Sequence, residues 1–219
     1  MKTILQEGLD NMRKRLEQEL NQCQNNLVLM LAYAQNSVHL LHSAINCNKA
    51  LDSESISNDE VKSDTCEKEI QQLIAKIILT QQPVASDLRY VSALLHLFSD
   101  LERINDQCVD ITEILESNTN YHLINPVKQM AKLVDEMVGL CVNCAIGMDN
   151  QLALQIINLD DRLDECFTAC KQALIELLNH TNDESENVLN QLMIAKYFER
   201  IGDHSVNVAE WVMYYCDGE

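Results

Sequence analysis

Leu-Glu-Arg-Ile-Asn-Asp at residues 101–106 is nearly repeated as Phe-Glu-Arg-Ile-Gly-Asp at residues 198–203. The two stretches are 97 residues apart, and the same offset, without a gap, aligns further identities along both halves of the chain. These are Ala34 with Ala131, Cys47 with Cys144, Asp52 with Asp149, Asp64 with Asp161, Val91 with Val188, Leu95 with Leu192, Val109 with Val206 and Glu113 with Glu210. A unit this long, present twice, is not a solenoid repeat and predicts two similar folded units.

The composition restricts these units to helical folds. The chain has 219 residues but only 5 glycines and 2 prolines, whereas all-β folds need these residues at their many turns. Between residues 16 and 45, apolar side chains recur every three or four positions, as expected for a helix with one buried face. Similar patterns predict helices over 57–81 and 87–116, and from Pro126 to about Cys216 with breaks at 149–150 and 181–183.

The repeat and the helices together predict an all-α fold of six long helices. Each copy contains three apolar stripes, which can pack together and close a three-helix bundle. The polar stretch 117–122 separates the copies, so we expect two tandem, similar bundles over residues 1–118 and 121–219.

The charge balance favours cations as ligands. Asp and Glu outnumber Lys and Arg by 34 to 16, for a net charge of −18. Nucleic acid and anionic lipid would be repelled by such a surface. The N-terminal residues contain no continuous apolar segment typical of a signal peptide, and no apolar run approaches the ~18 residues of a membrane span. We therefore expect a soluble, cytoplasmic protein that reaches membranes only through partners.

Nine cysteines raise the question of a thiolate metal site. Cys141 and Cys144 form a Cys-x-x-Cys pair, and Cys166 and Cys170 lie one helical turn apart. A structural zinc site needs four ligands, and no second such pair or nearby histidine pair completes the set. We interpret the cysteines as small buried apolar side chains, kept free by a reducing compartment.

An acidic stripe runs along the predicted helix over 87–116. At about 100° per residue, Glu102, Asp106, Asp110 and Glu113 fall within a sector of roughly 80°, opposite the apolar residues. The second copy repeats this stripe with Glu199, Asp203 and Glu210, and has Asn207 at the position of Asp110. Like charges one turn apart destabilise a helix. The stripe therefore indicates either a cation site on the outer face of each bundle or a merely solvated acidic surface.

Further acidic residues lie on the preceding helix of each copy. Asp64 and Glu67 correspond to Asp161 and Asp164, and Glu102 follows Asp64 by 38 positions, as Glu199 follows Asp161. If the helical hairpin brings these positions together, each copy offers four or more carboxylates. Such oxygen ligands suit Mg²⁺, Mn²⁺, Ca²⁺ or iron. The candidate metal ligands are Asp64, Glu102, Asp106, Asp110, Asp161, Glu199 and Asp203.

A metal-storage protein or a di-metal carboxylate enzyme is the alternative function. Ferritin-like bundles use Glu-x-x-His on two helices and direct these ligands into the core. None of the six histidines here has a glutamate three residues before it, and His204 stands alone beside Asp203. The sequence also has no phosphate-binding loop and no Gly-x-Ser-x-Gly or His-Glu-x-x-His motif. These observations favour a protein that is not an enzyme.

Three motifs together resemble those of the PhoU family. They are Gln-Pro-Val-Ala-Ser-Asp-Leu-Arg at 82–89, Leu-Glu-Arg-Ile-Asn-Asp at 101–106 and Phe-Glu-Arg-Ile-Gly-Asp-His at 198–204, the last followed by Asn207 and Glu210. The resemblance covers essentially the whole chain, including the duplication. It implies two three-helix bundles side by side whose Glu/Asp-x-x-x-Asp motifs bind iron or zinc in some members. Asn105 departs from the family pattern, which has glycine there.

The resemblance also implies a function. PhoU proteins are cytoplasmic regulators that repress the phosphate-starvation response when phosphate is plentiful, and they link the phosphate ABC transporter to a sensor histidine kinase. We therefore expect a negative regulator of phosphate uptake and signalling that acts as a metal-binding helical adaptor. We further expect a homodimer. A helical adaptor that binds no metal remains a third interpretation.

Overall fold

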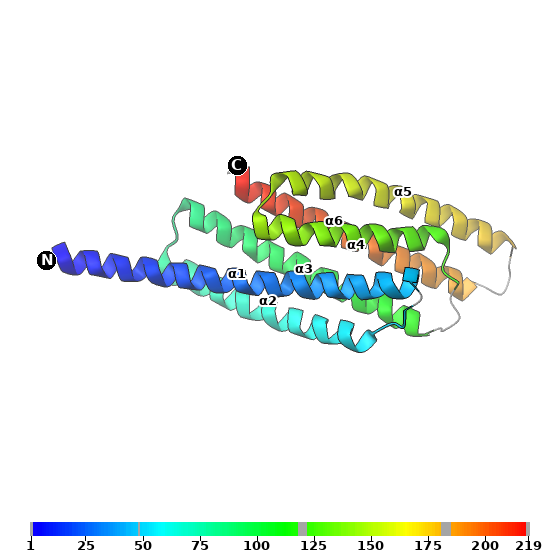
Figure 1. The fold of residues 1–219 in the computed structure, drawn as a ribbon, viewed down its shortest axis with the longest axis horizontal. Helices are drawn as coiled ribbons and strands as arrows, with labels where there is room; N and C mark the ends of the chain where they lie inside the picture. Colours follow the sequence, from blue (N-terminus) through cyan, green and yellow to red (C-terminus); the bar gives the residue numbers. More distant parts are fainter. Residues whose placement is uncertain (1, 48, 118–121, 181–184, 218–219) are drawn as a thin grey trace.

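Six α-helices make up the computed structural model, which describes residues 2–47, 49–117, 122–180 and 185–217. All six run roughly along one long axis of the molecule (Figure 1). The described residues contain no strand, so the predicted all-α fold is confirmed. The helices are α1 (Lys2–Cys47), α2 (Ser53–Gln81), α3 (Ala85–Ser117), α4 (Asn125–Gly147), α5 (Asn150–His180) and α6 (Ser185–Asp217).

Equivalent residues begin the second helix of each repeat. Asp52 precedes α2, and its Oδ1 accepts a hydrogen bond of 3.1 Å from the backbone N–H of Ser55. Asp149 precedes α5, and its Oδ1 accepts one of 2.7 Å from the backbone N–H of Gln151. Because the first backbone N–H groups of a helix have no partner within the helix, a carboxylate here stabilises the helix start. This role explains why Asp52 and Asp149 align in the repeat.

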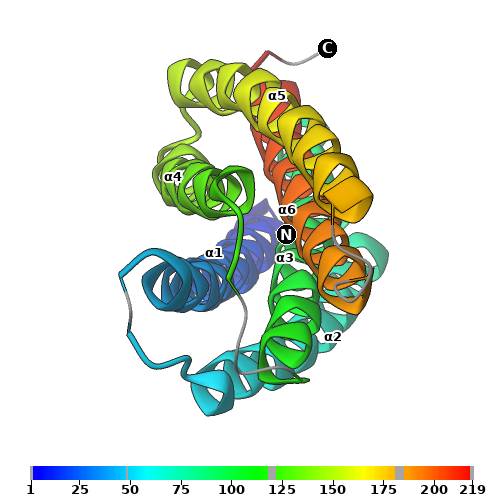
Figure 2. The same ribbon diagram turned by 90° about the vertical axis from the view of Figure 1, so that its right-hand side faces the viewer.

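The two repeats pack side by side. Within each repeat the three helices contact one another, and across the repeats α1 packs on α4 while α3 packs on α6. The view along the helices shows α2 and α5 at opposite ends of the arrangement, with the other four helices between them (Figure 2). Two seams, α1–α4 and α3–α6, therefore join the repeats.

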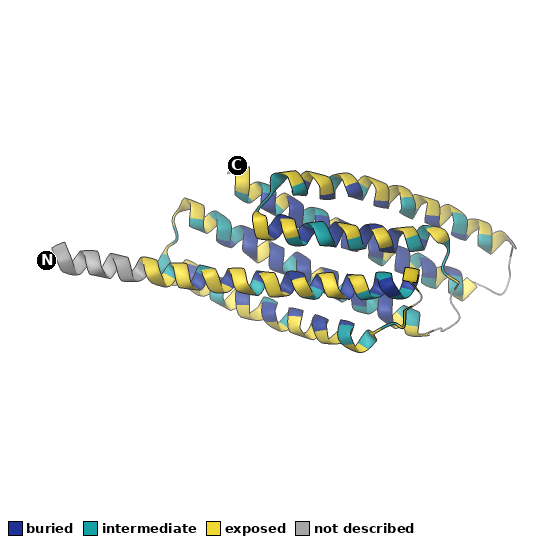
Figure 3. Ribbon diagram, viewed as in Figure 1, coloured by how far each residue is buried: buried dark blue, intermediate teal, exposed yellow. Residues whose placement is uncertain are grey.

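The core follows the inward faces of all six helices (Figure 3). Phe98 of α3 and Phe198 of α6 are among the largest fully buried side chains. All nine cysteines are free, and six are buried, as the interpretation as small apolar side chains requires. These six are Cys23, Cys66, Cys108, Cys141, Cys144 and Cys170, whereas Cys47 and Cys216 are exposed and Cys166 is half-buried.

Candidate metal centres

The helical hairpin of the first repeat gathers carboxylates from α2 and α3. We call this group acidic cluster 1, which consists of Glu60, Asp64, Glu67, Glu102 and Asp106. The side chain of Glu102 is only 17% exposed. Burial raises the pKa of Glu102 to about 7, and the charges of Asp106, Glu67 and Asp64 contribute to this rise. The structure thus places three of the predicted ligands, Asp64, Glu102 and Asp106, in one electrostatically coupled group.

The acidic stripe of α3 is less exposed than its position opposite the apolar face predicts. Glu102, Asp106 and Asp110 are half-buried, and only Glu113 is exposed. The reason is that α3 packs against α2 on one side and against α6 on the other. A helical wheel considers each helix alone and cannot show this second contact. The carboxylates therefore lie in grooves between helices, where their charges are screened less by water.

Asp110, another predicted ligand, lies at the seam between α3 and α6 and is not a member of acidic cluster 1. Burial, the charge of Asp110 and a hydrogen bond with it raise the pKa of Tyr197. The aligned positions in the other repeat form the matching contact, in which Asn207 Nδ2 donates to Asp100 Oδ1 at 2.9 Å. His204 Nδ1 lies 2.9 Å from the same oxygen. Asn207 and His204 therefore connect the repeats, and the sequence did not reveal this role.

The second repeat forms acidic cluster 2 between α5 and α6. The cluster consists of Asp160, Asp161, Asp164, Glu199 and Asp203. Burial raises the pKa of Asp160 to about 6, and the charges of the four other carboxylates contribute. The pKa of Asp203 is also raised by burial and by the charge of Glu199. The predicted ligands Asp161, Glu199 and Asp203 thus belong to one group, as their counterparts do in cluster 1.

Asp160 is a candidate ligand that the repeat alignment missed. It aligns with Ser63, which cannot supply a carboxylate, so the comparison of repeats selected the neighbouring Asp161 instead. Asp161 is exposed, whereas Asp160 is half-buried. The spacing of Asp160 and Asp164 would have revealed this residue, because positions four apart share a helix face.

Gly202 explains how the second repeat accommodates Asp160. A Cβ at this position would overlap Leu163 Cδ2 and approach Asp160 Oδ1 to 3.0 Å. The first repeat has Asn105 at this position instead, and Asn105 Nδ2 donates to the small Ser63 at 3.2 Å. In both repeats a small residue on one helix faces a larger one on the neighbouring helix: Ser63 faces Asn105, and Gly202 faces Asp160. Where the second repeat has Leu163 and Asp160, the first has the smaller Cys66 and Ser63, which leave space for the Asn105 side chain.

Three cations reduce the charge of the two clusters without neutralising it. Lys68 Nζ lies 2.6 Å from Asp64 Oδ2, and Arg103 Nε lies 3.7 Å from Glu102 Oε2. Lys196 pairs with Glu199 in the second repeat. Arg103 also lines a hollow of about 420 Å³ beside Asp106. Each cluster nevertheless has more carboxylates than cations.

The donor atoms of both clusters are of the kind that binds metal ions, but among the described residues neither cluster brings three ligand atoms within 4.8 Å of one another. The members of both clusters are carboxylates, which bind Mg²⁺, Mn²⁺, Ca²⁺ and iron. Glu102 and Asp160 are half-buried, and their pKa is raised first by burial and then by neighbouring carboxylates. A multivalent cation beside them would remove the repulsive part of that cost. The donor chemistry therefore matches the metal sites that the PhoU resemblance implies, and metal binding by these clusters stays a prediction.

The comparisons with known proteins agree with this arrangement. The PhoU domain model matches the chain twice, at residues 27–115 and 127–212. The phosphate-specific transport system accessory protein PhoU homolog of Clostridium acetobutylicum is 25% identical over 218 residues, covering 94% of this chain and 96% of that protein. The Synechocystis protein of the same name is 27% identical over 210 residues, covering 94% of this chain and 93% of that protein.

Solved structures show the same fold. PhoU from Pseudomonas aeruginosa superposes with a TM-score of 0.85 at 24% identity, covering 93% of this chain and 99% of that one. The phosphate transport system regulatory protein PhoU from Streptococcus pneumoniae gives a TM-score of 0.82 at 22% identity, covering 93% and 98%. None of the described helices is long and apolar enough to cross a membrane. The two matches to the PhoU domain model together cover most of the chain, so the chain belongs to the PhoU family.

Proposed function

We propose that this chain is a regulatory accessory protein of phosphate-specific transport. The observation that carries the proposal is the match, over nearly the full length of both proteins, to relatives that are named as accessory proteins of that system. The six-helix fold also supports the proposal, because the PhoU domain model matches both repeats and the acidic motif occurs in each of them. The chain would reduce phosphate uptake and the phosphate-starvation response when phosphate is plentiful.

The protein would act by docking rather than by catalysis. Its partners would be subunits of the phosphate ABC transporter and a sensor histidine kinase, contacted in the cytoplasm by a homodimer. The net charge of −18 supports contact with membranes only through such partners, because anionic lipid head groups would repel the chain. Long helices with wide exposed faces supply the surface that docking requires (Figure 3).

Metal binding by acidic clusters 1 and 2 would tune this docking. Each cluster joins two helices of one repeat, so an ion held there would draw α2 towards α3, or α5 towards α6. Iron, zinc and Mg²⁺ or Mn²⁺ are the candidate ions, since carboxylates bind hard cations and iron. The half-buried, mutually repelling carboxylates support this part of the proposal.

Deletion of the gene in its own host tests the regulatory function. We expect raised expression of phosphate-starvation genes and altered phosphate uptake in phosphate-rich medium, both restored by the wild-type gene. Unchanged expression together with unchanged uptake would contradict the proposal. Oxidase or hydrolase turnover by the purified, metal-loaded protein would favour the alternative carboxylate enzyme.

Elemental analysis of untagged protein tests the metal sites. We expect bound metal in wild type and its loss in a variant that combines Glu102→Ala, Asp106→Ala, Glu199→Ala and Asp203→Ala. The matched control combines Glu113→Ala and Glu210→Ala, which remove exposed carboxylates from the same two helices. Equal metal content in the fourfold variant and the control would show that the ligands are assigned wrongly.

A further inference from the structure

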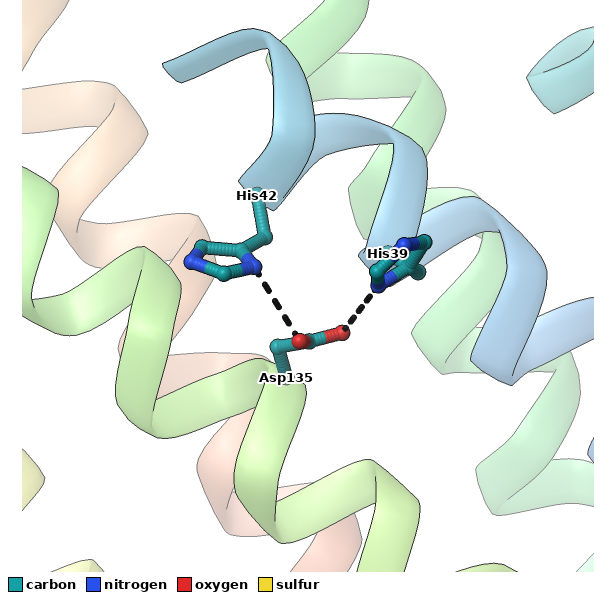
Figure 4. A group of neighbouring side chains, drawn as sticks. All are labelled: His39, His42 and Asp135. Atoms are coloured by element: carbon teal, nitrogen blue, oxygen red, sulfur yellow. Dashed lines mark ion pairs between the residues drawn. The ribbon is translucent and has the colours of Figure 1, made fainter. Parts of the chain in front are cut away.

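Two histidines of α1 and one aspartate of α4 converge at the α1–α4 seam, outside both acidic clusters. Figure 4 shows the rings of His39 and His42 on either side of the Asp135 carboxylate. His42 Nδ1 lies 3.1 Å from Asp135 Oδ2, and His39 Nδ1 lies 3.4 Å from Asp135 Oδ1. One ligand atom from each of the three side chains can be chosen so that all lie within 4.8 Å of one another.

Helix packing holds the three side chains in this arrangement. His39 and His42 are three residues apart on α1, so both project from the same face. The helices α1 and α4 run antiparallel: Asn46 Nδ2 donates to the backbone oxygen of Lys128 at 3.0 Å on one side of the group. On the other side Gly139 approaches Gln35, with 3.9 Å between the position of a Cβ at Gly139 and Gln35 Nε2. These contacts fix the register that brings Asp135 between the two rings.

The polar atoms of this group are incompletely satisfied. Nδ1 of His42 is enclosed by protein atoms, and among the described residues it has no hydrogen-bond partner in spite of its approach to Asp135. His39 Nε2 lies 3.5 Å from Ser43 Oγ, which leaves its Nδ1 directed towards Asp135. A hydrogen bond at one ring nitrogen orients the other as a metal ligand in many proteins. A buried nitrogen without a hydrogen bond is costly unless something binds it.

The distances suit one small ion. Zn²⁺ binds histidine nitrogen and carboxylate oxygen at about 2.0–2.2 Å, so two ligands of a tetrahedral site lie about 3.4 Å apart. Each histidine nitrogen lies near this distance from one of the two Asp135 oxygens, at 3.4 Å from Oδ1 for His39 and at 3.1 Å from Oδ2 for His42. His39 is 57% exposed and Asp135 24%, so an ion and a water molecule can reach the site.

We propose that His39, His42 and Asp135 form a zinc site that ties the first helix of one repeat to the first helix of the other. Both imidazole nitrogens and the Asp135 carboxylate bind the ion, and water completes its coordination. This donor set differs from the all-carboxylate clusters and prefers zinc to Mg²⁺ or Ca²⁺.

The site occurs once per chain because the repeat does not reproduce it. None of the residues at the aligned positions completes an equivalent group. The aligned pairs are His39 with Glu136, His42 with Gly139, and Val38 with Asp135. The expected stoichiometry is therefore one zinc ion, in contrast to the two acidic clusters.

Zinc titration of the full chain tests this proposal. To remove competing carboxylates, the titration uses a background variant with Glu102→Gln, Asp106→Asn, Glu199→Gln and Asp203→Asn. We expect this variant to bind one Zn²⁺ by calorimetry, with the ring-nitrogen NMR signals of two histidines shifted. His39→Ala or Asp135→Asn in the same background should lower the affinity at least about 100-fold, because even indirect partners of zinc ligands contribute 10–100-fold.

The matched control is His122→Ala, which removes an exposed histidine from elsewhere on the chain and should bind zinc as the background does. Equal zinc affinity in the background, His39→Ala and Asp135→Asn proteins would overturn the proposal, as would a folded background variant that binds no zinc. If the background variant does not fold, wild type is compared directly with His39→Ala, because the His39 side chain is 57% exposed and lies outside the apolar core. A loss of one zinc equivalent then supports the site, and an unchanged count overturns it.

Discussion

Glu102→Gln should stabilise the metal-free protein above neutral pH, although it removes a half-buried charged group. Burial and neighbouring carboxylates raise the pKa of Glu102 from 4.5 to about 7. Each pKa unit corresponds to about 1.4 kcal/mol. The raised pKa of Glu102 therefore lowers the free energy of unfolding at pH 8 by at most about 3 kcal/mol. Glutamine keeps the shape and removes the charge, and the lost contact with Arg103 offsets part of the gain. We expect a net gain of about 1–2 kcal/mol.

The sign of the pH dependence follows from the same shift. Between pH 4.5 and about 7 the folded protein holds a proton on Glu102 that the unfolded chain has released. The free energy of unfolding of metal-free wild type therefore falls as the pH rises through this window. The variant lacks this fall, so the difference between the two proteins should be largest near pH 8 and shrink towards about pH 4.5.

Urea unfolding of chelator-treated protein measures this difference without adding salt that would screen the charges. Glu113→Gln is the matched control, because Glu113 is exposed on the same helix, and its effect should stay within about 0.5 kcal/mol. A metal ion that binds the cluster should reverse the order, making wild type the more stable protein. If metal-free Glu102→Gln is less stable than wild type at pH 8, Glu102 is held by attraction, and the repulsion argument is wrong.

Three further measurements test the packing. Gly202→Ala should lower the free energy of unfolding by about 1–2 kcal/mol in urea, because overlap with Leu163 outweighs the better helix propensity of alanine; an increase would show that Leu163 moves aside. Asp100→Ala should lower the free energy of unfolding by about 2–4 kcal/mol in the same assay, because two donors on α6 lose their buried acceptor. An effect below about 0.5 kcal/mol would show that this contact does not stabilise the fold. A thiol reagent should label the exposed Cys47 at once and Cys141 only on unfolding, because burial raises the pKa of Cys141 to about 12; rapid labelling of Cys141 would contradict the core.

Local signals predicted most of the fold. Pro126 does lie in the first turn of α4, and the break at 149–150 coincides with the start of α5. Helix starts and ends depend on residues that are neighbours in the chain, so they can be predicted without knowledge of the tertiary packing. The break expected at 181–183 lies outside the described residues. The helix starting near residue 57 begins earlier, at Ser53, because Asp52 supplies the capping carboxylate.

The contacts between repeats could not be predicted in the same way. A helical wheel assigns each helix one buried face, but α3 buries polar residues at its seam with α6 as well. Asp100 is only 9% exposed and Gln107 3%, which the pattern of apolar residues does not indicate. The group of His39, His42 and Asp135 depends equally on how α1 packs against α4. Residues this far apart in the chain meet only through tertiary packing.

The two acidic clusters are related by the repeat but are not chemically equal. Cluster 2 has Asp160 where the first repeat has Ser63, and Gly202 makes room for that carboxylate. Cluster 1 has Asn105 instead, whose amide bonds Ser63 and accepts from Ser37 at 3.1 Å, so this position is committed to packing. The two positions are coupled by packing, because a Cβ at 202 would overlap Leu163 Cδ2 and approach Asp160 Oδ1 to 3.0 Å, so both side chains would have to shift. The duplicated fold therefore keeps the site in both halves, while this coupled pair gives the second half an additional half-buried carboxylate for binding a cation.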